Sequence, residues 1–282
     1  MKNTQKYKRV KMNVTKNCFS NLIPIYHINA FVRENQFSGN PAAVCPLNEF
    51  LPDEIMQAIA AQNNLAETAF IVLKESHCLI RWFAPKEEVT LCGHATLAAA
   101  HAIFNFISPT SNHIEFRSPL HILKASREND LITLDFPARP YEKIELPKIL
   151  KESITVTPKE VLASDDYLVV LKDQSHIENL VVDLNMLSKL DRRGVVFTAK
   201  GNQSDFVCRV FHPKLGIRED PVCGSAHCEL TPYWSKILNK TQLNATQLSS
   251  RGGDLLCELK NNRVILKGKC RTYLDGMIDV VL

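Results

Sequence analysis

The sequence predicts an α+β fold of two similar lobes, and an internal repeat is the first observation behind this prediction. The segment RWFAPKEEV at 81–89 recurs as RVFHPKLGI at 209–217, and CGHA at 92–95 recurs as CGSA at 223–226. Each copy reads as a strand, a proline turn, a loop, a Cys-Gly pair and then a helix. Two matches in the same order indicate two lobes related by internal duplication.

The second observation is the composition of the predicted helix at 94–107. Its sequence, HATLAAAHAIFNFI, is rich in alanine and apolar nearly all round. Such a helix requires burial on every side, and its small side chains allow a sheet to wrap closely around it.

Short strands separated by turn residues account for most of the remaining first half. The predicted helix at 51–62 begins with proline and carries acidic residues in its first turn. Strands are predicted at 26–31, 68–73, 78–83, 113–117, 120–125 and 131–135, with a glycine turn that enters an apolar run at 37–45.

Pro137 and Pro140 mark a boundary between the predicted lobes, 23–137 and 138–282. The second lobe has a predicted helix from Ser225 to about Leu238, whose start Pro232 is expected to make irregular. Whether the final strand returns to the first lobe is left open. Strand-like segments lie at 167–172, 194–199, 205–211, 251–259, 263–268 and 277–282.

The charge distribution separates residues 1–22 from the rest of the 282-residue chain. Residues 1–21 hold six basic residues and no acid, so the remainder is slightly acidic although the whole chain carries +4. Nucleic acid is therefore not expected as a partner. The segment 1–22 is expected to be a disordered basic leader, and a transit peptide or a start at Met12 are the alternatives.

The cysteines and the apolar runs bear on the location of the protein. Nine cysteines without a C-x-x-C pair indicate reduced thiols rather than a disulfide framework. The chain has no secretory signal and no apolar run long enough to cross a membrane. A cytoplasmic protein without membrane partners is expected.

Gly93 and Gly224 directly precede the two predicted repeat helices. Glycine there lets a ligand approach the backbone, and the first-turn N–H groups and the helix dipole attract an anion. Two such helix ends facing one another would hold a carboxylate and a developing negative charge. The alternative is that each glycine only eases a loop into a helix.

Four side chains are candidates for the chemistry. Glu67 lies among Leu, Ala and Phe, where desolvation would raise its pKa and suit it to carry a proton; the alternative is a solvated loop acid. His94 would be neutral at its helix N-terminus, or a cap. Asp220 would bind a polar group or shuttle a proton, or form a pre-proline turn. Ser225 would be a helix cap or a hydroxyl donor to a ligand.

Metal and nucleotide chemistry are not expected. Cys223, His227, Cys228 and Glu229 are close in sequence, but their spacing fits no standard zinc site. The serine-nucleophile motif G-x-S-x-G, the dinucleotide motif GxGxxG and the Walker loop are absent from the sequence.

Five motifs in the same order resemble the phenazine-biosynthesis-like (PhzF-type) isomerases, which are relatives of the diaminopimelate epimerases. They are AFVRENQFSGNPAAVC, NNLAETAFI, IRWFAPKEEVTLCGHATLAAA, EDPVCGSAH and SSRGGDL. The resemblance implies two pseudo-symmetric lobes, each a curved, mostly antiparallel sheet around a central helix. It also implies an active site between the lobes, a homodimer and no cofactor.

The resemblance assigns roles to individual residues. The acid/base glutamate falls on Glu67, and the catalytic histidine and aspartate fall on His94 and Asp220. The substrate-binding positions are Asn40, Gly93, Gly224, Ser225, Gly252 and Gly253. The chain departs from the family at Cys223, where threonine is common, and at FRSPL (116–120), where a strand-pair motif is altered.

The sequence therefore predicts a cofactor-independent isomerase that moves a proton on a small anionic metabolite. A two-thiol racemase is one alternative, because Cys92 and Cys223 occupy equivalent positions where a helix N-terminus lowers a thiol pKa. A ligand-binding protein that kept the scaffold without activity is the other.

Overall fold

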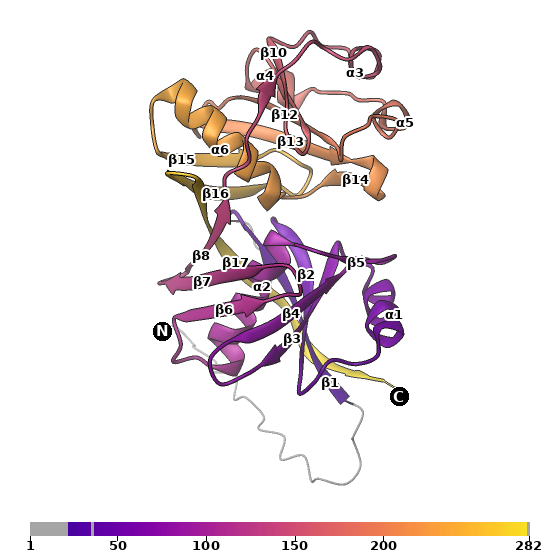
Figure 1. Ribbon diagram of the computed structural model, residues 1–282, viewed down its shortest axis with the longest axis vertical. Helices are drawn as coiled ribbons and strands as arrows, with labels where there is room; N and C mark the ends of the chain where they lie inside the picture. The colour runs from indigo at the N-terminus through magenta and orange to yellow at the C-terminus, as the bar shows by residue number, and fades with distance from the viewer. Residues whose placement is uncertain (1–21, 35–36, 281–282) are drawn as a thin grey trace, which may run out of the picture.

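A computed structural model describes residues 22–34 and 37–280, so the predicted leader lies almost wholly outside the described residues. The chain is α+β, as predicted, with many strands and few helices. Figure 1 shows two groups of elements, one containing α1 and α2 and the other α3 to α6. Within the described residues, no helix is both long enough and apolar enough to span a membrane.

The first half of the chain builds the lobe around α2 (Gly93–Ala102). Nearly all of this alanine-rich helix is buried, and it packs against β1, β2, β3, β8 and β17. The α-helix ends earlier than predicted and continues as a π-helical turn, Ile103–Ile107. The other elements are α1 (Asp53–Asn63), β1 (Leu22–Ala30), β2 (Asn40–Leu47), β3 (Glu67–Leu73), β4 (Cys78–Phe83), β5 (Glu88–Val89), β6 (His113–Arg117), β7 (Ile122–Glu128) and β8 (Leu131–Pro137).

The second half builds the other lobe against α6 (Gly224–Leu238). This helix is continuous despite Pro232, which lacks an N–H. The Cys228 carbonyl that Pro232 leaves free accepts the Arg139 N–H at 3.0 Å, which ties the connection between the lobes to the helix. The other elements are α3 (Lys148–Glu152), α4 (Gln174–Glu178), α5 (Leu184–Leu187), a 3₁₀ turn (Pro213–Leu215), β9 (Glu142–Lys143), β10 (Glu160–Ala163), β11 (Tyr167–Val170), β12 (Val195–Lys200), β13 (Phe206–His212), β14 (Ile217–Asp220), β15 (Gln242–Gln247) and β16 (Gly253–Lys260).

The last strand, β17 (Arg263–Asp279), joins the two lobes. It pairs antiparallel with β16 in the second lobe, then with β8 and β1 in the first. The segments at 263–268 and 277–279 are therefore parts of one strand. Apolar residues of α2, α6 and β17 belong to one buried cluster, so a single core runs through both lobes.

The two halves have the same order of strand pairings. In the first half, β2–β3 is parallel, β3–β4 antiparallel, β4–β6 parallel and β6–β7 antiparallel. In the second half, β11–β12 is parallel, β12–β13 antiparallel, β13–β15 parallel and β15–β16 antiparallel. The sequence repeat therefore coincides with a repeat of sheet topology.

Arg81 and Arg209, equivalent in the repeat, make matching contacts. Arg81 donates two hydrogen bonds of 2.7 Å to the Glu88 carboxylate, and its guanidinium lies 5.1 Å from the centre of the Phe83 ring. Arg209 donates two hydrogen bonds, of 2.7 and 3.0 Å, to the Glu219 carboxylate. Its guanidinium lies 5.1 Å from the centre of the Phe211 ring. Each pair of bonds is a bidentate fork that joins two strands, β4 to β5 in the first half and β13 to β14 in the second.

The start of β16 packs too closely for a side chain, which gives a stability prediction. A Cβ at Gly253 would lie 2.3 Å from Val222 Cγ2 and 2.6 Å from the Phe31 carbonyl oxygen. Gly253→Ala should therefore lower the free energy of unfolding by about 1–3 kcal/mol through overpacking, as measured by urea denaturation. Gly276→Ala is the matched control, because its Cβ would have no neighbour closer than 3.5 Å. Equal stability of both variants would contradict this packing.

Candidate active site

A cavity of about 750 Å³ lies between the two lobes. Its wall includes Glu67, His94 and Gly93 from the first lobe, and Asp220 and Gly224 from the second. A cavity of this size is typical of sites for small molecules. The structure therefore brings the predicted catalytic residues of both lobes to one cavity.

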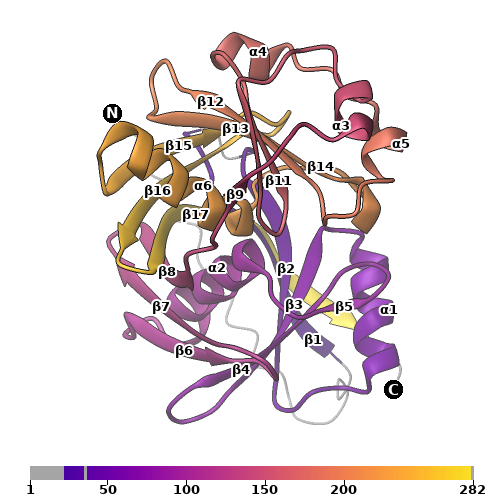
Figure 2. The same ribbon diagram turned by 45° about the horizontal axis from the view of Figure 1, so that its top comes forward.

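The two repeat helices meet end to end at this cavity (Figure 2). A Cβ at Gly93 would lie 3.7 Å from the Gly224 Cα, so the two backbones are nearly in contact. First-turn N–H groups of a helix have no acceptor within the helix, and they favour an anion. The N-termini of α2 and α6 therefore form one positively polarised region that both lobes share.

Glu67 and His94 form an ion pair on the first-lobe side. Glu67 Oε2 lies 3.1 Å from His94 Nε2, and the two side chains are only 12% and 7% exposed. This is an ion-pair distance, although the angles do not meet hydrogen-bond geometry and neither atom has a better partner among the described residues. A small reorientation would make it a charge-assisted hydrogen bond.

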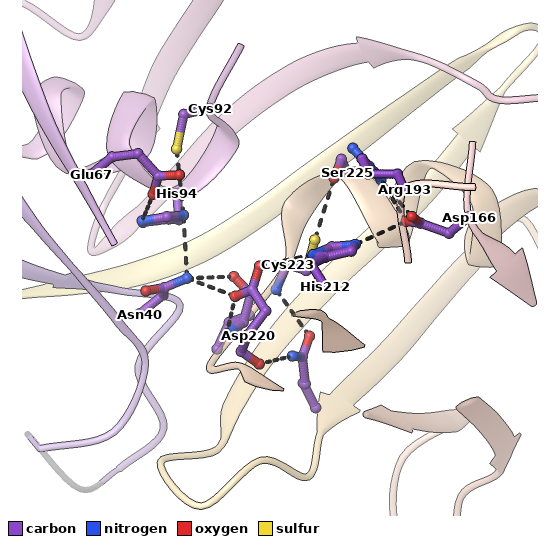
Figure 3. A network of polar contacts seen from close by, with 12 residues as sticks. Asn40, Glu67, Cys92, His94, Asp166, Arg193, His212, Asp220, Cys223 and Ser225 are labelled. Atoms are coloured by element: carbon purple, nitrogen blue, oxygen red, sulfur yellow. Dashed lines mark hydrogen bonds and ion pairs between the residues drawn. The ribbon is translucent and has the colours of Figure 1, made fainter. Parts of the chain in front are cut away.

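Asn40, at the start of β2, links this pair to the second lobe (Figure 3). Its buried amide nitrogen donates to Asp220 Oδ1 at 2.9 Å and to the Val222 carbonyl at 3.0 Å. The same nitrogen lies 3.2 Å from His94 Nδ1. An amide nitrogen only donates, so when the His94 ring is neutral Nδ1 accepts and the ring proton lies on Nε2, facing Glu67.

The pKa of Glu67 corrects the sequence-based expectation. Burial raises the pKa of this carboxyl, as predicted. His94, the Cys92 thiol and the charge of His212 together lower the pKa by more than burial raises it. The net pKa is below its ordinary value, so the predicted direction was wrong and Glu67 is ionised at neutral pH. Burial lowers the pKa of His94, but Glu67 and Asp220 raise it above its ordinary value. The expectation that the helix N-terminus favours the neutral imidazole therefore also had the wrong direction.

The pKa of Asp220 is shifted in the opposite direction. Burial raises the pKa of this carboxyl most, and the negative charge of Glu67 adds to the effect. Contacts with His94, His212 and the thiol of Cys223 only partly offset it. The cavity thus holds one carboxyl group with a lowered pKa and one with a raised pKa, an arrangement that separates an acid from a base.

The two cysteines of the repeat also correct a prediction. Cys92 and Cys223 precede α2 and α6 as expected and line the cavity. Burial raises both thiol pKa values well above the ordinary value, and the nearby carboxylates of Glu67 and Asp220 raise them further. The expectation that the helix dipole would lower these pKa values was wrong, because it considered the helix without its neighbours.

The structure places the remaining predicted site residues in different surroundings. Ser225 lines the cavity, with its Oγ 3.3 Å from the sulfur of Cys223. Asn40, Gly252 and Gly253 are not part of the cavity wall. Gly252 has a φ of +68°, which favours glycine, and its carbonyl accepts the Gly39 N–H at 2.7 Å. Both glycines therefore pack the loops behind the site.

A buried polar group in the second lobe was not predicted from the sequence. His212 lines the cavity, and its Nε2 lies 3.2 Å from Asp166 Oδ2. Arg193 donates two hydrogen bonds, of 3.0 and 2.5 Å, to the Asp166 carboxylate. Burial raises the pKa of Asp166, but His212 and Arg193 lower it well below its usual range. The signal in the sequence was His212 itself, because the other copy of the repeat has Ala84 at the equivalent position.

Strand register explains why His212 fits. Thr68 pairs with Phe83 in one half, and Val195 pairs with Phe211 in the other. The residue before Thr68 is the catalytic candidate Glu67, whereas the residue before Val195 is Gly194. A Cβ at Gly194 would lie 2.1 Å from the His212 ring. The second lobe thus has a glycine in place of the glutamate, and the imidazole occupies the space.

The family of the chain follows from comparison with known proteins. Residues 28–276 match the phenazine biosynthesis-like (PhzC-PhzF) family, so the chain belongs to this family. An uncharacterized isomerase of Pseudomonas aeruginosa is 44% identical over 258 residues, which cover 92% of this chain and 99% of the relative.

Solved structures agree with this assignment. A PhzF-family protein of Enterococcus faecalis is 43% identical, with a TM-score of 0.89 over 92% of this chain and all of the other. A hydroxyproline epimerase of Agrobacterium vitis, 9% identical, has a TM-score of 0.58 over 92% of each chain. At that identity the likeness concerns the fold alone, and it confirms the predicted relation to the epimerase fold.

Glu229, beside the site in α6, gives a prediction for stability against pH. It is fully buried, and burial together with Asp166 raises its pKa to about 9 although Arg193 opposes the shift. In the unfolded chain the ordinary pKa is 4.5. Between these values only the unfolded state releases the proton, so Glu229 makes the free energy of unfolding fall as pH rises.

In Glu229→Gln the side chain cannot ionise in the folded or the unfolded state. The substitution should therefore remove the fall in the free energy of unfolding with rising pH. The variant should match the wild type near pH 5 and exceed it by a few kcal/mol near pH 8, with a slope of at most about 1.4 kcal/mol per pH unit. Urea denaturation at several pH values measures the difference. Glu145→Gln, an exposed glutamate of the same lobe, is the control. A stability difference that does not grow with pH would contradict a buried, protonated Glu229.

Proposed function

We propose that the protein is a cofactor-independent isomerase that moves a proton on a small carboxylate-bearing metabolite, with Glu67 as the acid/base group. The observation that carries this proposal is the Glu67–His94 pair, 3.1 Å apart, on the wall of a cavity where two helix N-termini meet. Similar proteins that are named isomerases support the reaction class.

The substrate carboxylate would bind at the N-termini of α2 and α6. Their first-turn N–H groups and the Ser225 hydroxyl are the donors available there. Arg139 and Arg193 also lie in the cavity wall, where they are paired with Asp165 and Asp166, so the helix N-termini rather than the arginines supply the attraction for an anion. A small anionic metabolite is therefore the proposed partner.

The two carboxyl groups would divide the proton transfer. Ionised Glu67 would remove a proton beside a carbonyl group or double bond and return it at another carbon. His94, with its Nε2–H toward Glu67, would hold the carboxylate in position. Asp220, with its raised pKa, would keep a proton and donate it to the charge that develops on the substrate.

The wider organisation follows the same family resemblance. We infer that the two lobes, about 23–137 and 138–282, are pseudo-symmetric products of duplication, each a curved sheet around a central helix. The matching strand pairings and arginine forks support this inference. A homodimer that acts in the cytoplasm is the assembly we propose.

The two-thiol racemase is the alternative mechanism within the same cavity. Cys92 and Cys223 stand at equivalent helix ends, as such a mechanism requires. Their raised pKa values oppose it, since a thiol that removes a proton acts as the thiolate. We therefore assign the proton transfer to Glu67, with Cys223 in the place of the family's threonine.

Incubation with a metabolite extract in deuterated water should identify a compound that gains deuterium, which a ligand-binding protein without activity would not produce. With this substrate, Glu67→Gln should lower kcat by at least about 10²-fold, because the amide cannot accept the proton. Cys223→Thr should stay within about tenfold of the wild type. Glu87→Gln, at another glutamate of the cavity wall, is the control and should be active.

The reverse ranking would overturn the mechanism. If Cys223→Thr were inactive and Glu67→Gln retained most of its kcat, the protein would be a thiol enzyme. If no compound gained deuterium although anions bound in the cavity, the isomerase proposal would fail.

A further inference from the structure

The second-lobe wall of the cavity carries a cluster of three different donor side chains. We propose that His212, Asp220 and Cys223 bind a zinc-type divalent metal ion, with a fourth coordination position open to the cavity. One ligand atom from each residue lies within 4.8 Å of the others, and all three residues are buried in the cavity wall. Imidazole, carboxylate and thiolate are the three donor types that zinc uses in proteins.

His212 is held in the orientation of a metal ligand. Its Nε2 lies 3.2 Å from Asp166 Oδ2, and Arg193 fixes that carboxylate by a bidentate fork. This contact occupies Nε2 and leaves Nδ1 as the ring nitrogen that can bind a metal ion. Nδ1 lies 4.0 Å from Asp220 Oδ2. A carboxylate behind the histidine is the usual support of a metal-binding imidazole.

Asp220 and Cys223 likewise have one group held by neighbouring residues and a second donor atom that faces His212 or the cavity. Asp220 Oδ1 accepts the Asn40 amide at 2.9 Å and the Val222 N–H at 3.1 Å, which leaves Oδ2 toward His212. The Cys223 N–H donates to Gln247 Oε1 at 2.9 Å, while the sulfur lies on the cavity side near Ser225. Figure 3 shows the sulfur beside the His212 ring.

Two of the three ligands are residues that the repeat or the family resemblance does not predict. His212 stands where the other copy of the repeat has Ala84, and Gly194 provides the space for its ring. Cys223 stands where the family resemblance predicts threonine. These changes lie on different elements, β13 and the start of α6, yet converge on Asp220. Neither is required by the proton transfer assigned to Glu67.

The equivalent cluster of the first lobe is less suited to an ion. Glu67, Cys92 and His94 also lie within 4.8 Å of one another. However, His94 Nε2 faces Glu67 directly, and Nδ1 faces the amide of Asn40 rather than a carboxylate. No acidic group supports the back of this ring among the described residues, so the proposed site lies in the second lobe only.

Charge and distance are compatible with a bound ion. A divalent ion with one thiolate, one carboxylate and one neutral imidazole is electrically neutral, and binding releases the thiol proton and any proton on Asp220. Tetrahedral zinc ligands lie roughly 3.3–3.6 Å apart, given bonds of about 2.0–2.3 Å. The three side chains would need to draw in by about 1 Å to reach this spacing.

Metal binding would stop the proposed isomerase. The ion would occupy Asp220 Oδ2, so this carboxyl group could no longer donate a proton. This consequence rests on the proposed function, whereas binding itself does not. The structure thus assigns the cavity an inhibitory metal site as well as a site for an anion.

Dialysis against Zn²⁺ and then metal-free buffer, followed by metal analysis, tests the proposal. The wild type should retain one ion per chain, and Co²⁺ in its place should give the absorption of a thiolate–cobalt bond. Cys223→Thr and His212→Ala should each weaken binding at least about tenfold, and Asp166→Asn about 10–100-fold through the lost support of His212. Cys228→Ala, a buried cysteine of the same cavity wall, is the matched control and should bind normally.

Three results would overturn the proposal: no retained ion, retention unchanged in Cys223→Thr, or equal loss in Cys228→Ala. Circular dichroism identifies a variant that fails to fold, and Cys223→Thr then decides, because threonine is the residue common in the family. Glu67→Gln should bind Zn²⁺ like the wild type. Failure of the metal site is therefore distinguishable from failure of the isomerase mechanism.

Discussion

The close approach of two helix N-termini is the constraint on which the rest of the structure depends. Gly93 and Gly224 bring the backbones of α2 and α6 almost into contact. The alanine-rich α2 can reach this point because a sheet wraps closely around it, and β17 pairs with strands of both lobes and so fixes their relative position. The cavity, its positive polarisation and the meeting of catalytic groups from two lobes all follow from this contact.

Neighbouring groups around this contact give its two carboxyl groups opposite pKa shifts. The lowered pKa of Glu67 arises from His94, and the raised pKa of Asp220 arises from burial that its partners do not fully offset. Asn40 connects Asp220 to the partner of Glu67, since its amide nitrogen donates to Asp220 and lies 3.2 Å from His94 Nδ1. The same separation that suits an acid and a base leaves one oxygen of Asp220 available to a metal ion.

Local patterns predicted most of the fold, and tertiary contacts decided what they missed. The repeat, the buried helix and most strands were visible because each depends on neighbouring residues, whereas the unity of β17 depends on partners in both lobes. Glu67, His94 and Asp220 were found by motif, but the pKa of Glu67 was predicted in the wrong direction because His94 lies on another element. Asp166 and Arg193 carried no sequence signal, since only the packing of two loops joins them to His212.

The two carboxyl groups of the cavity should lose their protons in a fixed order, Glu67 at a lower pH than Asp220. Infrared difference spectra recorded over a pH series, on protein freed of metal by a chelator, measure this order directly. The carboxylate band that Glu67→Gln removes should appear at a lower pH than the carboxylate band that Asp220→Asn removes. The reverse order, or the same pH for both bands, would contradict the assignment of Glu67 as the base and Asp220 as the acid.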